Sequence, residues 1–148
     1  TECGLADLFP AFSGDQMFVC FATGEAGSKN DDWLISPQLH GDAQTISFYA
    51  RTVVPEYGLE QFEVLYSTTG TNRDDFIALG DVETVPAVWT DYRYELPEGT
   101  KYFAIHCVSS GTFALSVDAL CKKAAVPGTT QPKTPARRIA ALKLIPIL

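Results

Sequence analysis

The sequence predicts an all-β protein folded as an antiparallel sandwich, and three observations support this. Eight short segments either alternate apolar and polar residues or are rich in β-branched and aromatic ones. Clusters of Gly, Pro, Asn, Asp and Ser separate them at the spacing typical of sandwiches. No helical period runs through residues 1–121, and 148 residues leave room for one domain with a hydrophobic core.

The stretch 30–39 joins a polar, acidic turn directly to a strand that begins at Trp33. Its Trp, Leu and Ile side chains favour a pleated surface. Pro37 has no amide hydrogen to donate, so we expect the strand to end there or to lie near the border of its sheet. Asp31 and Asp32 therefore stand where a strand begins.

The other predicted strands follow from the same patterns. Residues 16–22 are apolar on both faces, which is typical of a strand covered on both sides. Residues 45–52 and 61–67 alternate, as half-buried strands do. The remaining predicted strands are 76–82, 88–96, 101–108 and 112–120.

The last predicted strand, 112–120, follows Ser109-Ser110-Gly111, a turn short enough for a hairpin. Alternation along this strand places Asp118 on the face opposite the residues expected to face inward. The residues expected to face inward are Phe113, Leu115, Val117 and Ala119.

The chain is expected to have three parts. Residues 1–121 form the sandwich, and residues 122–135 are a linker rich in Pro, Gly, Thr and Gln. Residues 136–148 are a basic tail outside the sandwich, for which the pattern allows a short helix, or a terminus that is mobile or docks locally.

Charge is divided unevenly along the chain. Residues 1–121 hold all 18 acidic residues and five basic ones, a net charge of −13, whereas residues 122–148 have six basic residues and no acidic one. An acidic body repels phosphate backbones, so nucleic acid is excluded as its partner.

No apolar run approaches the roughly 20 residues of a membrane span. The start of the chain shows no leader pattern. We therefore expect either an intracellular protein, or one whose leader peptide has already been removed or lies outside this fragment.

Four cysteines stand too far apart for a zinc ribbon or a redox motif. Cys20 and Cys107 lie in apolar strand patterns, where a free thiol behaves as a small buried hydrophobe. A bridge between Cys3 and Cys121 is the alternative for the other two, and the sequence does not fix the connectivity.

Four motifs follow one another along the chain: the acidic turn leading into Trp-Leu-Ile-Ser-Pro (33–37), Val-Leu-Tyr-Ser-Thr-Thr-Gly (64–70), Pro-Ala-Val-Trp-Thr (86–90) and the end strand 113–119. In this order they resemble the motifs of cleaved adhesin domains. The resemblance covers roughly residues 14–120. Such modules occur in the adhesin regions of gingipain-type surface proteases and in surface proteins of Bacteroides-like bacteria, and are similar to choice-of-anchor J modules.

This resemblance implies a jelly-roll β-sandwich at the cell surface or outside the cell, where it binds a host surface or matrix protein, or a glycan. It also implies structural calcium and the company of other domains in a larger surface protein. Oxygen ligands suit calcium, and the acidic turn supplies Asn30, Asp31 and Asp32. Asp118 joins them in the predicted site if the first and last strands lie together, although the family's second adjacent acid is replaced by Ala119.

Aromatic side chains are the predicted ligand contacts. Tyr57 lies in a loop beside an acid, and Tyr92 and Tyr94 are expected on an outward face. Tyr49 is expected to pack against the protein.

No catalytic residue is predicted. The chain lacks the Gly-x-Ser-x-Gly elbow, the His-Glu-x-x-His motif and the phosphate loop. Glu60 and Glu63 are the acids considered as a glycosidase pair. A binding module therefore ranks first, ahead of a structural spacer without a ligand and a jelly-roll glycoside hydrolase.

Overall fold

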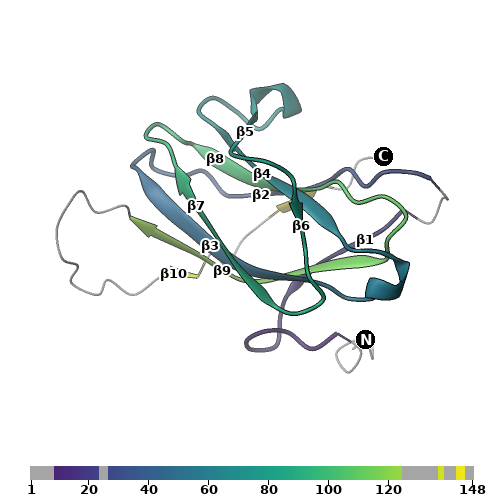
Figure 1. Ribbon diagram of the computed structural model, residues 1–148. Coiled ribbons are helices and arrows are strands. Elements are labelled where there is room, and N and C mark those ends of the chain that lie inside the picture. Colours follow the sequence, from purple (N-terminus) through teal and green to yellow (C-terminus); the bar gives the residue numbers. More distant parts are fainter. Residues whose placement is uncertain (1–8, 24–26, 125–136, 139–142, 146–148) are drawn as a thin grey trace.

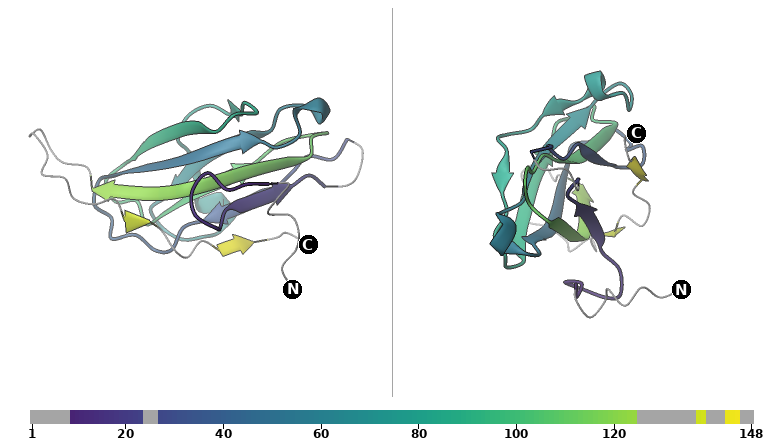
Figure 2. Two further views of the ribbon diagram at one scale, coloured as in Figure 1. Left: turned by 90° about the horizontal axis from the view of Figure 1, so that it is seen from below. Right: turned by 90° about the vertical axis from the view of Figure 1, so that its right-hand side faces the viewer.

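The computed structural model describes residues 9–23, 27–124, 137–138 and 143–145. Its strands form two antiparallel sheets stacked face to face (Figures 1 and 2), so the predicted all-β sandwich is confirmed. Short 3-10 turns, η1 (Pro55–Tyr57) and η2 (Arg73–Asp75), interrupt the strand connections.

The first sheet has the order β1-β9-β3-β7, and β10 pairs with β9 beyond the end of β1. The first and last strands of the body, β1 and β9, therefore lie side by side, which is the condition under which Asp118 was to join the predicted calcium site. The bounds are β1 (Phe18–Phe21), β3 (Gln44–Thr52), β7 (Thr90–Leu96), β9 (Ala114–Ala124) and β10 (Arg137–Arg138).

The second sheet has the order β11-β2-β8-β4-β5, and β6 also pairs with β4. Strand β2 has only the short β11 on its outer side, which agrees with the border position expected from Pro37. The bounds are β2 (Asp32–Ile35), β4 (Gln61–Ser67), β5 (Ile77–Ala78), β6 (Glu83–Thr84), β8 (Tyr102–Cys107) and β11 (Lys143–Ile145).

The core lies between the sheets, where alternate residues of each strand meet. Strand β3 alternates strictly between buried and half-buried positions, and Phe48 at its centre packs on Phe62 of β4, with ring centroids 5.5 Å apart. Further fully buried side chains fill the layer, among them Ile46, Phe103, Ile105 and Leu115.

Two local expectations are wrong. Strands β8 and β9 belong to different sheets, so the turn at 109–111 crosses between sheets and is not a hairpin. In addition, β3 and β9 change register between Ser47 and Tyr49, where β9 holds one extra residue. Ala119 occupies that bulge with φ 52°, so it does not face the core, and Leu120 is buried instead.

The tail also differs from one of its two readings. Arg137–Arg138 and Lys143–Ile145 are strands that extend the two sheets, so a helix is wrong at these residues. Strand β9 continues to Ala124, three residues beyond the predicted end of the sandwich. The rest of the linker and tail lies outside the described residues.

Candidate ligand-binding surface

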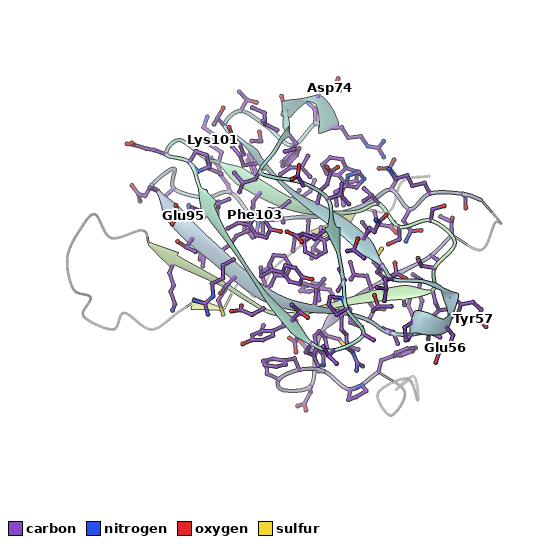
Figure 3. The ribbon with its side chains drawn as sticks, viewed as in Figure 1. Glu56, Tyr57, Asp74, Glu95, Lys101 and Phe103 are labelled. Atoms are coloured by element: carbon purple, nitrogen blue, oxygen red, sulfur yellow. The ribbon has the colours of Figure 1, made fainter. Side chains whose placement is uncertain are left out.

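An exposed group of aromatic rings lies at one end of the sandwich, and we call it the aromatic surface: Phe21, Tyr57 and Phe113, with Phe9 beneath them. Tyr57 leaves 64% of its surface exposed, Phe21 48% and Phe113 39%. Figure 3 shows Tyr57 and its neighbour Glu56 at the end of the molecule opposite Glu95.

The turn η1 holds Tyr57 outward. Pro55 fixes the backbone at the first helical position, where a missing amide hydrogen costs nothing. Gly58 ends the turn with φ 115°, a conformation open to glycine, and its amide donates to the Pro55 carbonyl at 3.0 Å. The turn therefore projects the Tyr57 ring beyond the end of the sheet.

Phe113 lies at the centre of the aromatic surface and is fixed by its backbone. Its amide donates to Glu60 Oε1 at 2.9 Å, and its carbonyl accepts from the Ala22 amide at 2.8 Å. Its ring centroid lies 6.0 Å from that of Tyr57 and 6.1 Å from that of Phe21. The strand alternation expected to bury Phe113 fails because β9 begins only at Ala114.

Exposed rings of this kind can cover the apolar face of a sugar or anchor a protein side chain. Contiguous exposed apolar surface commonly marks a binding site on a soluble domain. Leu59, 44% exposed, extends the apolar character beside η1. The aromatic surface is therefore suited to binding, and it includes Tyr57 from the predicted set.

Tyr92 and Tyr94 do not face outward as expected. Both lie at inward positions of β7, where their rings stack on Phe48 with centroid distances of 5.7 and 6.2 Å. Burial, and then the neighbouring Glu83 carboxylate, raises the pKa of both phenols. The alternation was read with the wrong phase, and these tyrosines pack against the core.

Asp31, predicted as a calcium ligand, belongs to an ionic network on the outer face of the second sheet. Its Oδ1 accepts from Trp33 Nε1 at 2.9 Å and lies 2.8 Å from His106 Nε2, while its Oδ2 lies 2.9 Å from Arg73 Nη1. Burial alone would raise the pKa of Asp31, but the hydrogen bonds from Trp33 and His106 and the charge of Arg73 together hold it below its usual value.

His106 is the centre of this network. Its Nδ1 lies 2.8 Å from Glu63 Oε1, opposite the contact with Asp31, and its ring stacks on Trp33 with centroids 4.1 Å apart. Ionised carboxylates only accept hydrogen bonds, so the ring satisfies both of them when each nitrogen carries a proton. We call Asp31, Glu63, Arg73 and His106 the outer network.

Sequence reasoning placed His106 on an outward face but did not find the outer network. The network depends on register, since His106 lies directly opposite Trp33 of β2 on one side and Glu63 of β4 on the other. Only the alternation of these three strands, which places all three residues outward, was available as a signal.

Of the other predicted calcium ligands, Asn30 and Asp32 both contact the Cys20 sulfur, whereas Asp118 lies elsewhere, in the first sheet. Asp32 points between the sheets, where its Oδ2 lies 3.0 Å from the Cys20 thiol. Asn30 is buried, and its Oδ1 accepts from the Thr23 amide at 3.0 Å. Asp118 lies opposite Tyr49 in the first sheet and accepts from the Ser13 amide at 2.8 Å.

Strand alternation explains this separation, because Asp31 and Asp32 are adjacent and so point to opposite faces. The four predicted donors do not converge. Within the described part of the chain, no three side chains of His, Cys, Asp or Glu are grouped as metal ligands. Glu2, the other acid considered near this site, lies outside the described residues.

Glu60 and Glu63, considered as a glycosidase pair, serve separate structural roles. Glu60 is fully buried and holds the Phe113 amide, whereas Glu63 is on the outer face with His106. They therefore do not face each other across a common space.

The model of the family described as Cleaved Adhesin Domain matches residues 5–121. The chain belongs to this family. No sequence among the curated proteins matches the chain.

Three solved structures similar to this cleaved adhesin domain are adhesin domains of Lys-gingipain. The K3 domain from Porphyromonas gingivalis is 22% identical, with TM-score 0.68 and coverage of 76% of this chain and 74% of that one. The K1 domain from the same species is 25% identical (TM-score 0.66, coverage 74% and 75%), and the K2 domain is 23% identical (TM-score 0.66, coverage 78% and 76%). The shared fold therefore extends over most of each chain.

These similar structures are adhesin domains of Lys-gingipain, a non-catalytic part of that enzyme. Among the described residues, no helix is long and apolar enough to cross a bilayer.

Proposed function

We propose that this cleaved adhesin domain is a non-catalytic binding module of a surface or extracellular protein, and that it recognises a host protein or a glycan through the aromatic surface. The observation that carries the proposal is the group of exposed rings around Phe113. Membership of the family supports the adhesive role, and the exposure of these rings supports the location.

The fixed backbone of Phe113 supports this proposal. A ring held by hydrogen bonds at its own amide and carbonyl loses little freedom on binding, so less of the interaction energy is spent on ordering it. Tyr57 adds a phenol that can hydrogen-bond at the rim, and exposed Glu56 lies beside it. Apolar rings with polar groups at their edge suit both sugars and protein partners.

The test is a glycan array and a panel of matrix proteins, probed with the wild-type domain and with Tyr57→Ala. We expect Tyr57→Ala to weaken the best-bound ligand at least tenfold, about 1.4 kcal/mol. Ile77→Ala is the matched control, because Ile77 is an exposed apolar residue on β5, away from η1, and its loss should leave binding unchanged.

A structural spacer is the competing reading, and the same screen separates it. Wild-type protein that binds nothing on either panel would favour the spacer. Equal binding by wild type and Tyr57→Ala would keep the adhesive role but remove the aromatic surface as its site.

Calcium binding stays a prediction, although the four donors named from the sequence do not all meet at one place in the described part of the chain. An ion that binds only the folded state raises the free energy of unfolding by about 2.7 kcal/mol when its free concentration is one hundred times its dissociation constant. The test is the melting temperature in millimolar calcium and in excess chelator. Identical melting curves would count against a structural calcium.

A further inference from the structure

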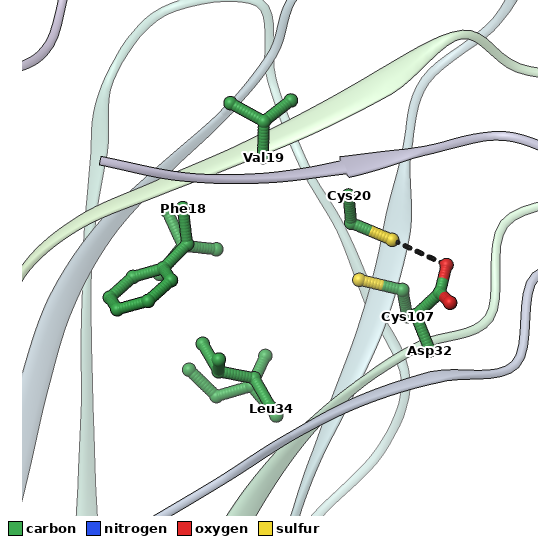
Figure 4. Close-up of a pocket in the computed structure, with 8 residues that line it drawn as sticks. Phe18, Val19, Cys20, Asp32, Leu34 and Cys107 are labelled. Atoms are coloured by element: carbon green, nitrogen blue, oxygen red, sulfur yellow. Dashed lines mark hydrogen bonds between the residues drawn. The ribbon is translucent and has the colours of Figure 1, made fainter. Parts of the chain in front are cut away.

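Cys20 and Cys107 face each other between the two sheets, although they lie far apart in sequence. The structure records both as free thiols, one on β1 at the edge of the first sheet and one at the end of β8 in the second. We call them the thiol pair. Figure 4 shows the two side chains pointing toward each other beside Asp32.

Strand register and one short contact explain this meeting. Cys107 lies directly opposite Asp32 in the β2–β8 pair, and opposed residues of neighbouring strands share a face. The Asp32 carboxylate also lies 3.0 Å from the Cys20 sulfur, so Asp32 is a neighbour of both cysteines. The two sheets thus bring both sulfurs to one place in the interior.

The surroundings of the thiol pair are mostly apolar, with the Asp32 carboxylate and the Asn30 amide as the polar groups beside Cys20. The cavity that both cysteines line is otherwise formed by Asp32 and by the side chains of Phe18, Val19, Leu34, Ile105 and Val117. The contact with Cys107, then burial, and then Asp32 raise the pKa of the Cys20 thiol. At neutral pH Cys20 is therefore protonated and slow to react, so oxidation depends on time and on an oxidant.

We propose that the thiol pair closes to a disulfide between the sheets when the domain meets a small-molecule disulfide such as oxidised glutathione. The Cys20 sulfur gives its proton to the Asp32 carboxylate and attacks one sulfur of the oxidant, which breaks the S–S bond of the oxidant and forms a mixed disulfide. The released small thiolate takes the proton back from Asp32 and leaves as a thiol. The Cys107 sulfur then attacks the Cys20 sulfur and displaces the second small thiol. Two protein thiols become one disulfide, and their two protons leave on the two released thiols.

This bond would secure a weakly held part of the fold. Strand β1 has four residues and, among the described strands, pairs only with β9. A bond from Cys20 to Cys107 would tie β1 to the centre of the second sheet and close a loop of roughly 90 residues, and long loops are where cross-links restrict the unfolded chain most. Inter-sheet disulfides stabilise other sandwiches in the same way.

Cys121 provides the control. It lies opposite Ser47 in the first sheet, on the face turned away from the core, so the thiol pair and Cys121 are on different sides of the sheet. Cys121 is a free thiol in the structure.

The test is to incubate the full chain with oxidised glutathione, digest it without reduction and map linked peptides by mass spectrometry. The expected product joins the peptides of Cys20 and Cys107. Oxidised wild type should melt several degrees higher than the same sample after dithiothreitol. Cys121→Ser should keep this difference, and Cys20→Ser and Cys107→Ser should lose it.

Peptide mapping on wild-type protein needs no variant to fold, so a destabilised Cys107→Ser would not obscure the result. The proposal fails if folded wild type retains free Cys20 and Cys107 after prolonged oxidation. It also fails if Cys20 or Cys107 is found linked to Cys3 or Cys121 instead of to each other.

Discussion

The aromatic surface and the outer network both consist of side chains that could bind a ligand, but they differ in whether those side chains already have partners within the protein. In the outer network each charged group meets a partner: His106 lies between Asp31 and Glu63, and Arg73 lies against Asp31. On the aromatic surface, Tyr57 and Phe113 contact other rings on one side and leave the other side exposed.

This difference shows which side chains serve stability and which are free to serve recognition. Polar groups that already have partners have little to gain from a ligand, since a new contact must replace an existing one. Exposed rings gain by losing contact with water. We therefore expect changes in the outer network to affect folding and changes at the aromatic surface to affect binding.

Removal of His106 should have the largest effect on stability. His106→Ala removes the ring nitrogens that Asp31 and Glu63 contact and the ring stacked on Trp33, so we expect the free energy of unfolding to fall by about 2–3 kcal/mol. Urea denaturation measures it. His40→Ala is the control, because His40 is exposed and its loss should change stability by less than about 0.5 kcal/mol. A loss of ligand binding by folded His106→Ala would break the division between the regions.

Truncation of Phe113 should have the next largest effect, on binding. Phe113→Ala removes the ring that contacts the other three members of the aromatic surface, so we expect at least tenfold weaker binding, about 1.4 kcal/mol, and a stability loss of about 1 kcal/mol. Titration of the ligand found in the screen measures the first. Val88→Ala, at another exposed apolar residue, should change neither. Unaltered affinity in Phe113→Ala would show that the rings are packing alone.

Acid sensitivity should show the smallest effect. The folded pKa of Asp31 lies below its ordinary value of 3.8, so its contribution is complete above that value and is lost as pH falls through the folded pKa. Arg73→Ala should raise this pKa and, because the Arg73–Asp31 pair is half exposed, cost less than about 0.5 kcal/mol at neutral pH. Carboxyl NMR titration follows Asp31 directly, and an unmoved titration would exclude Arg73 as a cause.

Sequence patterns identified the strands well because alternation and turn residues act locally. Strand β3 lies within one residue of its predicted start, and the predicted loop at Tyr57 is where the exposed ring stands. The segment predicted as one strand at 76–82 contains only the two-residue β5, and β6 begins just after it, at Glu83. Short edge pieces give little periodic signal.

Relations between strands could not be predicted in this way. The predicted calcium site assumed that Asp32 and Asp118 share a space, but they lie on different faces of the sheets, and sheet order decides that. His106 and Glu63 are adjacent only through the β4–β8 register. Tyr92 and Tyr94 were assigned outward because alternation alone does not say which of the two faces is buried.

The bulge at Ala119 has a consequence for the length of the chain. Asp118 lies opposite Tyr49, and Cys121 opposite Ser47, so three steps along β9 match two along β3. Excision of Ala119 would therefore leave Val117 and Leu120 on their present side and simply straighten the ladder, whereas excision of an ordinary β9 residue would invert every side chain beyond it. Position 119 is thus a place where β9 can lose one residue without changing which of its side chains face the core.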